Sequence, residues 1–230
     1  MLDTLCIDAG GVLVNPNWER VAAVLRAHGV AAEAAALAAA EPRAKRELDV
    51  PGRVRATDDR SRSWLYFDLV VAHARLEAAP ARLERARAEL AAYHARFGLW
   101  EWVVPGVPEA LARLRDLGLR LVVVSNSNGT LRDKLGRLGL GGFFAAVIDS
   151  HEVGVEKPDP GIFAAGLAQA GSAPERALHL GDLYEVDVVG ARAAGVEAVL
   201  VDPATLYAGY DCPRVPSLRA FADALAAGPA

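Results

Sequence analysis

Asp8 stands at the end of a short apolar run, and Gly10 and Gly11 follow it after a single alanine. The run Thr4–Asp8 has the composition of a buried strand, and the glycines predict a tight turn directly after it. A carboxylate at the C-terminal end of such a strand is a common basis for an active site in an open α/β sheet. Asp8 is therefore a candidate nucleophile or metal ligand, with a turn-capping role as the alternative. Gly10 stands where a second carboxylate would complete an acid pair.

Three further polar sites follow later apolar runs of the chain. Ser125 and Asn126 come after a run of leucine and valines, Lys157 precedes a proline in a predicted loop, and Asp182 and Asp187 follow another apolar run. Taken singly, each has an ordinary structural explanation: a helix cap, a loop lysine or a solvated helix residue. Because each follows its own predicted strand, in order, we expect all of them at one edge of a parallel sheet.

Together these residues have the chemistry of phosphoryl transfer with a divalent metal. Asp8 could attack phosphorus, and Asp8 and Asp182 could share Mg²⁺, which prefers oxygen ligands. Lys157 would offset the charge of carboxylate and phosphate. Ser125, with Asn126 beside it, would hold phosphoryl oxygens together with backbone N–H groups.

The elements that must position these side chains alternate between strand and helix after residue 100, which predicts an α/β fold with a doubly wound parallel sheet. Residues 16–100 instead have helical spacing throughout, so we expect an all-α cap inserted into a discontinuous core of residues 1–15 and 101–230. The expected strands are Thr4–Asp8, Arg120–Ser125, Ala146–Asp149, Ala177–Gly181 and Ala198–Val201. The expected helices lie near 17–28, 31–41, 58–78, 81–97, 107–117, 129–138, 159–171 and 184–194.

The bulk composition narrows the classes of protein. The chain has 230 residues, of which 53% are hydrophobic, and this is ample for a core. Its net charge of −4 argues against binding nucleic acid through bulk charge. No apolar run reaches the ~20 residues of a membrane span, and no secretory leader is evident. We expect a cytoplasmic protein that binds neither nucleic acid nor membrane.

The chain resembles the haloacid dehalogenase-like (HAD) hydrolase superfamily, in the group with a helical cap inserted after the first motif. Asp8 matches the nucleophile of the first motif, Ser125 the second, Lys157-Pro158 the third, and Asp182 with Asp187 the fourth. The resemblance covers essentially the whole chain. It implies a Rossmann-like core, an aspartyl-phosphate on Asp8, and phosphatase activity on a small phosphorylated metabolite. It also implies Mg²⁺ held at Asp8, Asp182 and Asp187, and at the backbone carbonyl of Gly10.

The departure from the family pattern is Gly10, because related phosphatases use a second aspartate there as general acid and base. Such help is typically worth ~10²–10⁴ in rate. The alternatives are substrates with good leaving groups, a proton donor from the cap, or a weakly active or non-catalytic protein that binds phosphate ligands. A metal-independent 2-haloacid dehalogenase is a further alternative, which the retained Asp182 and Asp187 disfavour. The candidate cap donors are Glu19, His28, Asp58, Asp59 and His73.

The cap offers three further features with open interpretations. Its aromatic residues could line a substrate cavity, although their helical spacing favours a core. Lys45 could form a Schiff base, but it stands among arginines in a polar stretch. Six arginines surround a predicted loop at Val50–Thr57, which could close on a substrate or be a solvated surface. The aromatic residues are Trp18, Trp64, Tyr66, Phe67, Trp100 and Trp102, and the arginines are Arg43, Arg46, Arg53, Arg55, Arg60 and Arg62.

Overall fold

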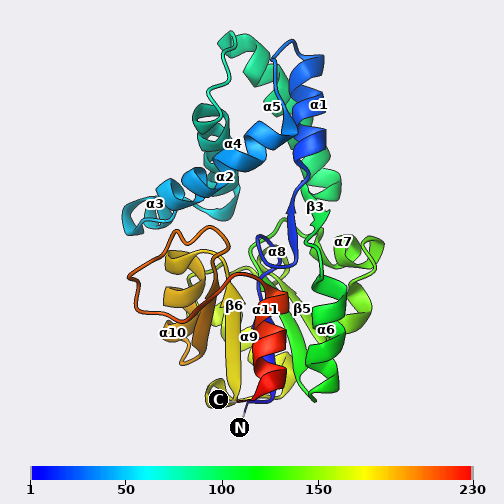
Figure 1. The fold of residues 1–230 in the computed structure, drawn as a ribbon, viewed down its shortest axis with the longest axis vertical. Coiled ribbons are helices and arrows are strands. Elements are labelled where there is room, and N and C mark those ends of the chain that lie inside the picture. The colour runs from blue at the N-terminus through cyan, green and yellow to red at the C-terminus, as the bar shows by residue number, and fades with distance from the viewer. Residues whose placement is uncertain (1, 229–230) are drawn as a thin grey trace. The chain divides into compact units, whose positions relative to one another are not determined.

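The computed structural model describes residues 2–228, which form two compact units. One unit contains residues 2–15 and 102–228 and holds the main sheet; the other is Pro16–Glu101 and is mainly helical. Figure 1 shows the sheet unit with its strands at the centre and helices around them. The chain passes between the units twice, and the two passages pair as strands β2 and β3, at Val14–Pro16 and Trp100–Val103.

The main sheet has six strands in the order β5-β4-β1-β6-β7-β8, and its ladders are parallel. This confirms the predicted doubly wound sheet. From β1 the chain builds outward through β4 and β5, then returns to the other side of β1 for β6, β7 and β8. The strand order thus reverses beside β1, and ligands of open α/β sheets bind at the C-terminal ends of strands at such a point. The strands are β1 (Thr4–Ile7), β4 (Arg120–Ser125), β5 (Ala146–Asp149), β6 (Ala177–Gly181), β7 (Glu197–Val201) and β8 (Arg214–Val215).

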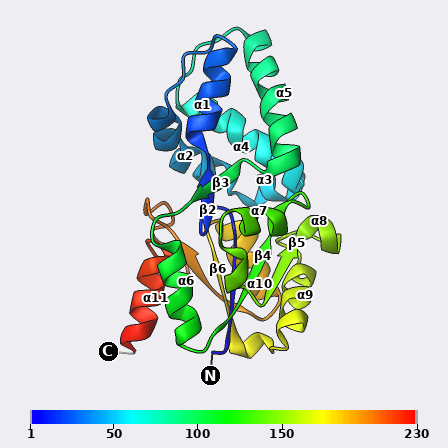
Figure 2. The same ribbon diagram turned by 90° about the vertical axis from the view of Figure 1, so that its right-hand side faces the viewer.

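Helices cover both faces of this sheet. Figure 2 shows α6 and α11 on one side of it and α9 on the other. Valine and isoleucine side chains of β4 and β5 pack against Ile162 and Phe163 of α9 in one buried cluster. Such buried parallel strands carry nearly continuous hydrophobic runs, which is why they were recognisable from sequence. The helices are α6 (Val107–Asp116), α7 (Leu131–Arg137), α8 (Ser150–Val153), α9 (Pro160–Ala170), α10 (Val189–Ala193) and α11 (Leu218–Ala227).

The helical unit differs from the predicted boundaries in three places. The helix expected to stop near residue 41 continues through Pro42, because Leu37, Ala44 and Leu48 bury one face of it in the unit's core. The loop expected at Val50–Thr57 is largely a short helix, and the helix expected to reach residue 78 ends at His73. The helices are α1 (Trp18–Ala27), α2 (Ala34–Leu48), α3 (Pro51–Ala56), α4 (Asp59–His73) and α5 (Pro80–Phe97).

The aromatic residues of the helical unit form its core. Trp18, Tyr66 and Phe67 are buried, and Phe67 packs edge-on against Trp18 at 5.8 Å between ring centroids. Trp64 and Trp100 pack on the same cluster, while Trp102 is half exposed. The core interpretation is therefore confirmed for this cluster, and cavity lining is wrong for the three buried rings.

The arginines near α3 do not form one solvated loop. Arg62 is buried and donates a hydrogen bond to the backbone carbonyl of Thr57 at 2.8 Å. Arg53 pairs with Glu47 at 2.9 Å, and Lys45 lies 3.3 Å from Glu41. The contacts of Arg62 and Arg53 hold the segment between α2 and α4 in place, and the pair of Lys45 and Glu41 lies within α2.

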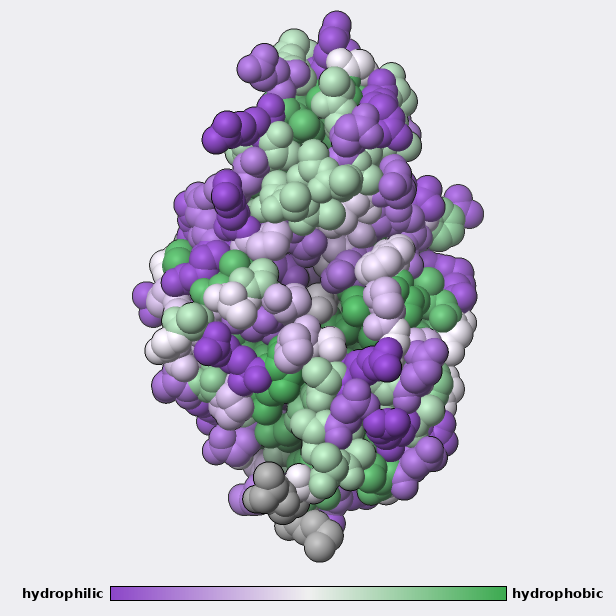
Figure 3. All heavy atoms as spheres, in the orientation of Figure 1, coloured by the Kyte–Doolittle hydropathy of each residue, from purple (hydrophilic) through white to green (hydrophobic). Residues whose placement is uncertain are grey.

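None of the described helices combines the length and apolar character of a bilayer span. Hydrophilic and hydrophobic side chains are mixed over the face in Figure 3. The large hydrophobic residues that are well exposed come from four separate segments: Trp102, Leu117, Val189 and Leu225.

Candidate active site

Asp8 follows the inner strand β1 directly, at the C-terminal edge of the sheet. Its side chain is mostly buried, and Oδ1 accepts a hydrogen bond from the N–H of Ala9 at 2.7 Å. The same oxygen lies 2.9 Å from Nζ of Lys157. The carboxylate is thus fixed in orientation and faces a cation.

The glycines after Asp8 let the chain turn close to the second acidic site. Gly11 has a φ of +71°, and a Cβ atom there would lie 2.0 Å from Oδ2 of Asp182. A side chain at this position would therefore displace Asp182 as well as strain the backbone. Gly10 lies within the same turn, where it bridges to Val14, and it brings no acid to the site.

Asp182 and Asp187 belong to the turn that follows β6. A π-helical turn at Tyr184–Val188 folds the Asp187 side chain back over the end of the strand. A Cβ atom on Gly181 would lie 2.1 Å from Cγ of Asp187, so this approach requires glycine. Single π-helical turns occur frequently at functional sites.

Asp187 is the most densely bonded acid of the group. Its Oδ1 lies 2.7 Å from Nζ of Lys157 and 2.9 Å from Nε2 of His179. Its Oδ2 accepts the N–H groups of Asp182 and Leu183, at 3.1 and 3.0 Å. Each oxygen therefore has two donors, which fills the lone pairs of the carboxylate.

Lys157 joins the two acids. Its side chain is 1% exposed, and Nζ bridges Asp8 and Asp187. The amide of Asn126 fixes the lysine backbone from both sides, accepting its N–H at 2.7 Å and donating to its carbonyl at 3.0 Å. The structure thus shows Asn126 holding Lys157; its predicted phosphate contact stays a prediction.

The opposite charges of Lys157 and its two acid partners shift the pKa values of Lys157 and Asp187. Burial by itself would raise the pKa of Asp187, but the Lys157 ammonium and the His179 hydrogen bond outweigh it and hold that pKa well below its usual range. Burial would lower the pKa of Lys157, but the charges of Asp187 and Asp8 outweigh it and raise that pKa above its usual value. Lys157 is therefore a cation and Asp187 an anion at neutral pH.

Ser125 ends β4, the strand next to β1, and is 4% exposed. Its hydroxyl makes a long hydrogen bond of 3.3 Å to the carbonyl of Asn126. This weak contact leaves the hydroxyl able to turn toward a stronger acceptor. The strand order and parallel pairing place Ser125 at the same sheet edge as Asp8, as the sequence predicts.

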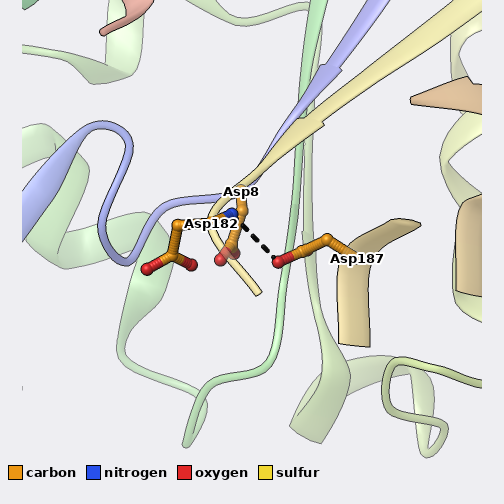
Figure 4. Close-up of side chains that lie close together, drawn as sticks. All are labelled: Asp8, Asp182 and Asp187. Carbon is orange, nitrogen blue, oxygen red and sulfur yellow. Dashed lines mark hydrogen bonds between the residues drawn. The ribbon is translucent and has the colours of Figure 1, made fainter. Parts of the chain in front are cut away.

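The three acids have the composition of a site for a hard divalent cation. Asp8, Asp182 and Asp187 each offer one oxygen within 4.8 Å of the others, and all three are buried (Figure 4). Three carboxylates beside one lysine carry a formal charge of about −2, which a divalent cation balances. Oxygen ligands of this kind suit Mg²⁺.

Several proton donors suggested by the sequence are engaged inside the helical unit. His28 lies 2.8 Å from Glu89, and His73 lies 2.9 Å from Glu47. Asp58 caps α4 in a capping box with Ser61, and this hydrogen bond lowers the pKa of Asp58. A carboxyl with a lowered pKa is a poor general acid at neutral pH.

His179 is the residue near this site that the sequence analysis did not single out. It lies within β6, three residues before Asp182, and its side chain is fully buried. The available signal was a polar ring inside an otherwise apolar parallel strand. Its contact with Asp187 depends on the fold-back over Gly181, which sequence spacing does not reveal.

A parallel sheet with an acid after its inner strand, a buried lysine and an acid pair after the neighbouring strand defines a class of Rossmann-like α/β proteins with an acidic site at the C-terminal edge of the sheet. Residues 2–195 match the family model described as haloacid dehalogenase-like hydrolase. The chain belongs to this family.

Curated relatives agree with this assignment. The chain is 34% identical to "Haloacid dehalogenase-like hydrolase domain-containing protein 3" of Mus musculus over 192 residues, covering 82% of this chain and 76% of that protein. It is 47% identical to a phosphoserine phosphatase of Thermus thermophilus over 102 residues, which cover 43% of this chain and 41% of that one. The match spans 42%, 41% and 58% of the first three curated relatives.

The fold is also found in a solved structure of low sequence identity. The putative HAD-hydrolase YfnB of Bacillus subtilis, bound to magnesium, has a TM-score of 0.69 at 17% identity. The comparison covers 97% of this chain and 98% of that one.

Proposed function

We propose that this protein is a Mg²⁺-dependent hydrolase of a small phosphomonoester, with Asp8 as its nucleophile. The observation that carries the proposal is the fixed Asp8 carboxylate, 2.9 Å from the buried Lys157 ammonium and grouped with Asp182 and Asp187. Family membership and the phosphatases among the relatives support it.

In the first step, an oxygen of Asp8 forms a bond to phosphorus while the bond from phosphorus to the leaving oxygen breaks. The leaving alkoxide takes a proton from solvent water, and Asp8 becomes an aspartyl-phosphate. Lys157 stays protonated and offsets the negative charge of carboxylate and phosphate. The Ser125 hydroxyl, released from its long contact, donates to a phosphoryl oxygen.

In the second step, water attacks phosphorus, and the bond from phosphorus to the Asp8 oxygen breaks. The attacking water gives up a proton to solvent, inorganic phosphate leaves, and the Asp8 carboxylate is restored. Gly10 supplies neither the proton of the first step nor the base of the second. We therefore propose that breakdown of the aspartyl-phosphate is slow and that good leaving groups are favoured.

The metal would be held by Asp8 and Asp182 and by the backbone carbonyl of Gly10. When bound, Mg²⁺ supplies positive charge that neutralises the phosphoryl group and orients it. Asp187 belongs to the same acidic group, but its four donors favour an indirect role through the backbone of Asp182.

The proposal is tested with p-nitrophenyl phosphate and a panel of phosphomonoesters that includes phosphoserine and glyceraldehyde 3-phosphate. We expect turnover that requires Mg²⁺, stops with EDTA and falls to background in Asp8→Asn. The matched control is Asp3→Asn, at the other end of the β1 segment, where the carboxylate binds Arg120 and Arg176. That variant should keep full activity.

Three results would each overturn the proposal. Activity that survives Asp8→Asn or EDTA would exclude the nucleophile or the metal. Halide release from a 2-haloacid without metal, in the absence of any phosphatase activity, would establish the dehalogenase alternative. Absence of both activities, with phosphate-ligand binding retained, would indicate a binding protein.

A further inference from the structure

We infer that His179 is a positioning residue of this site, which holds Asp187 so that Asp187 can hold both Lys157 and the turn carrying Asp182. The inference rests on the proposed function for its kinetic consequence. Its structural content stands on the contacts of the buried imidazole ring.

His179 makes a polar contact from inside the hydrophobic core. The side chain is fully buried in β6, between Cys6 of β1 and Ala198 of β7 in the sheet register. Its ring packs edge-on against Phe163 at 5.0 Å between centroids. Burying a polar ring costs free energy unless the ring makes a compensating hydrogen bond.

One of the two ring nitrogens of His179 makes such a hydrogen bond. Nε2 lies 2.9 Å from Oδ1 of Asp187, whereas Nδ1 is buried without a hydrogen-bond partner among the described residues. Because a carboxylate oxygen only accepts, Nε2 must carry the donated proton. A proton on Nδ1 would be buried with no acceptor, so the contact with Asp187 fixes the tautomer.

The contact reaches the reacting groups through Asp187. Its Oδ1, which His179 approaches, also binds Nζ of Lys157 at 2.7 Å, and that Nζ lies 2.9 Å from Asp8. Its Oδ2 binds the N–H of Asp182 at 3.1 Å. Rotation of the Asp187 carboxylate would therefore move the lysine and the acidic turn together.

A matched pair of substitutions separates this role from simple core filling. His179→Gln and His179→Met have unbranched side chains of similar length, and only glutamine can donate a hydrogen bond to Asp187. Residues that orient the groups around a metal typically contribute about 10–100-fold in activity or metal affinity. We expect kcat to fall by about that factor in the Met variant, with KM changing less, and we expect the Gln variant to recover most of the loss.

Crystal structures of the two variants give a readout that does not depend on turnover. The Gln variant should keep the contacts of Lys157 with Asp187 and Asp8, and the Met variant should lose at least one of them. The control is Ile162→Val on α9, a buried change within the apolar cluster that removes no polar group. It should lower the melting temperature slightly and leave kcat unchanged.

Equal kcat in the Gln and Met variants, or an undisturbed Lys157 in the Met variant, would overturn the inference. If neither variant folds, nitrogen-15 NMR of His179 in the wild type decides it. The inference requires the ring proton on Nε2, and a proton on Nδ1 alone would refute it. A wild-type protein without phosphatase activity would remove the proposed function, while the structures and the ring tautomer would still test the role of His179.

Discussion

Lys157 is the residue on which the charge balance of the site depends. Its buried ammonium lies between two carboxylates, those of Asp8 and Asp187, and pairs with both. Removing one partner of a buried ion pair typically costs about 3–5 kcal/mol, because the remaining charge is left uncompensated. The two acids would then face each other without the ammonium.

The pH dependence of this loss follows from the shifted pKa values. The pKa of Asp187 is lowered in the folded protein, so its ion pair contributes its full stabilisation above the usual aspartate pKa of about 3.9. That stabilisation is lost as pH falls from there through the lowered pKa of the folded protein. The pKa of Lys157 is raised, so its contribution is present below about 10.4 and is lost as pH rises through the raised value.

Lys157→Met should therefore lower the free energy of unfolding by about 3–5 kcal/mol at pH 7. The deficit should shrink at pH 4, because without the ammonium the pKa of Asp187 is no longer held so low and its carboxylate becomes neutral more readily. Urea denaturation of wild type and variant at both pH values measures this. An equal deficit at both would show that the lysine acts through packing alone.

Gly10 gives a second prediction at this scale. Gly10→Asp should raise turnover on alkyl phosphates, whose leaving oxygens need a proton, more than on p-nitrophenyl phosphate. The reason is that general acid–base help is worth ~10²–10⁴ mainly where the leaving group is poor. The ratio of kcat values on the two substrate types is the measurement. An unchanged ratio would mean that another group already supplies the proton.

At the scale of elements, the turn after β6 positions Asp182 and Asp187. Gly181 allows the Asp187 side chain to pack against the end of the strand. Gly181→Ala puts a methyl group where Asp187 lies, so we expect a loss of about 1–3 kcal/mol in stability and a large loss of kcat. The matched control is Gly136→Ala in α7, where an added Cβ meets nothing within 4 Å. That variant should be stabilised by about 0.4–1 kcal/mol and stay active. Equal activity in both variants would contradict the tight approach of Asp187.

The elements also show where sequence reasoning succeeds and where it stops. Five of the six strands of the sheet were predictable because their apolar runs are buried; the two-residue strand β8, which is not buried, was not predicted. Asp8 and Asp182 directly follow two of these strands, and Ser125 ends a third. The full length of helix α2 was not predicted, because burial of Leu37 and Leu48 in the unit's core extends the helix beyond the expected end near residue 41. The short strands β2 and β3 have little local signal, since they arise from pairing of residues far apart in the chain.

The same distinction applies to the candidate site. Residue types and their order predicted which polar side chains gather at one sheet edge. They did not predict that Asn126 holds the backbone of Lys157, or that His179 reaches Asp187. Both contacts depend on loop paths that bring residues together across the sheet edge, and periodicity carries no information about them.

At the scale of the whole molecule, the chain is a sheet unit interrupted by a helical unit, and it belongs to the haloacid dehalogenase-like hydrolases. The described contacts of Asp8, Lys157, Asp182 and Asp187 lie within the sheet unit. Several candidate donors of the helical unit are bound to their own neighbours. We therefore propose that the sheet unit supplies both the nucleophile Asp8 and the ammonium of Lys157, and that the helical unit serves as the cap.

The central claim is that Asp8 becomes phosphorylated during turnover, and acid quenching followed by mass spectrometry tests it most directly. Wild-type protein reacting with p-nitrophenyl phosphate and Mg²⁺ should yield a peptide in which Asp8 carries one phosphoryl group. The slow second step expected from Gly10 should make this species abundant, and Asp8→Asn should abolish it. Sustained phosphate release with no label on Asp8, or with the label on another residue, would contradict the account.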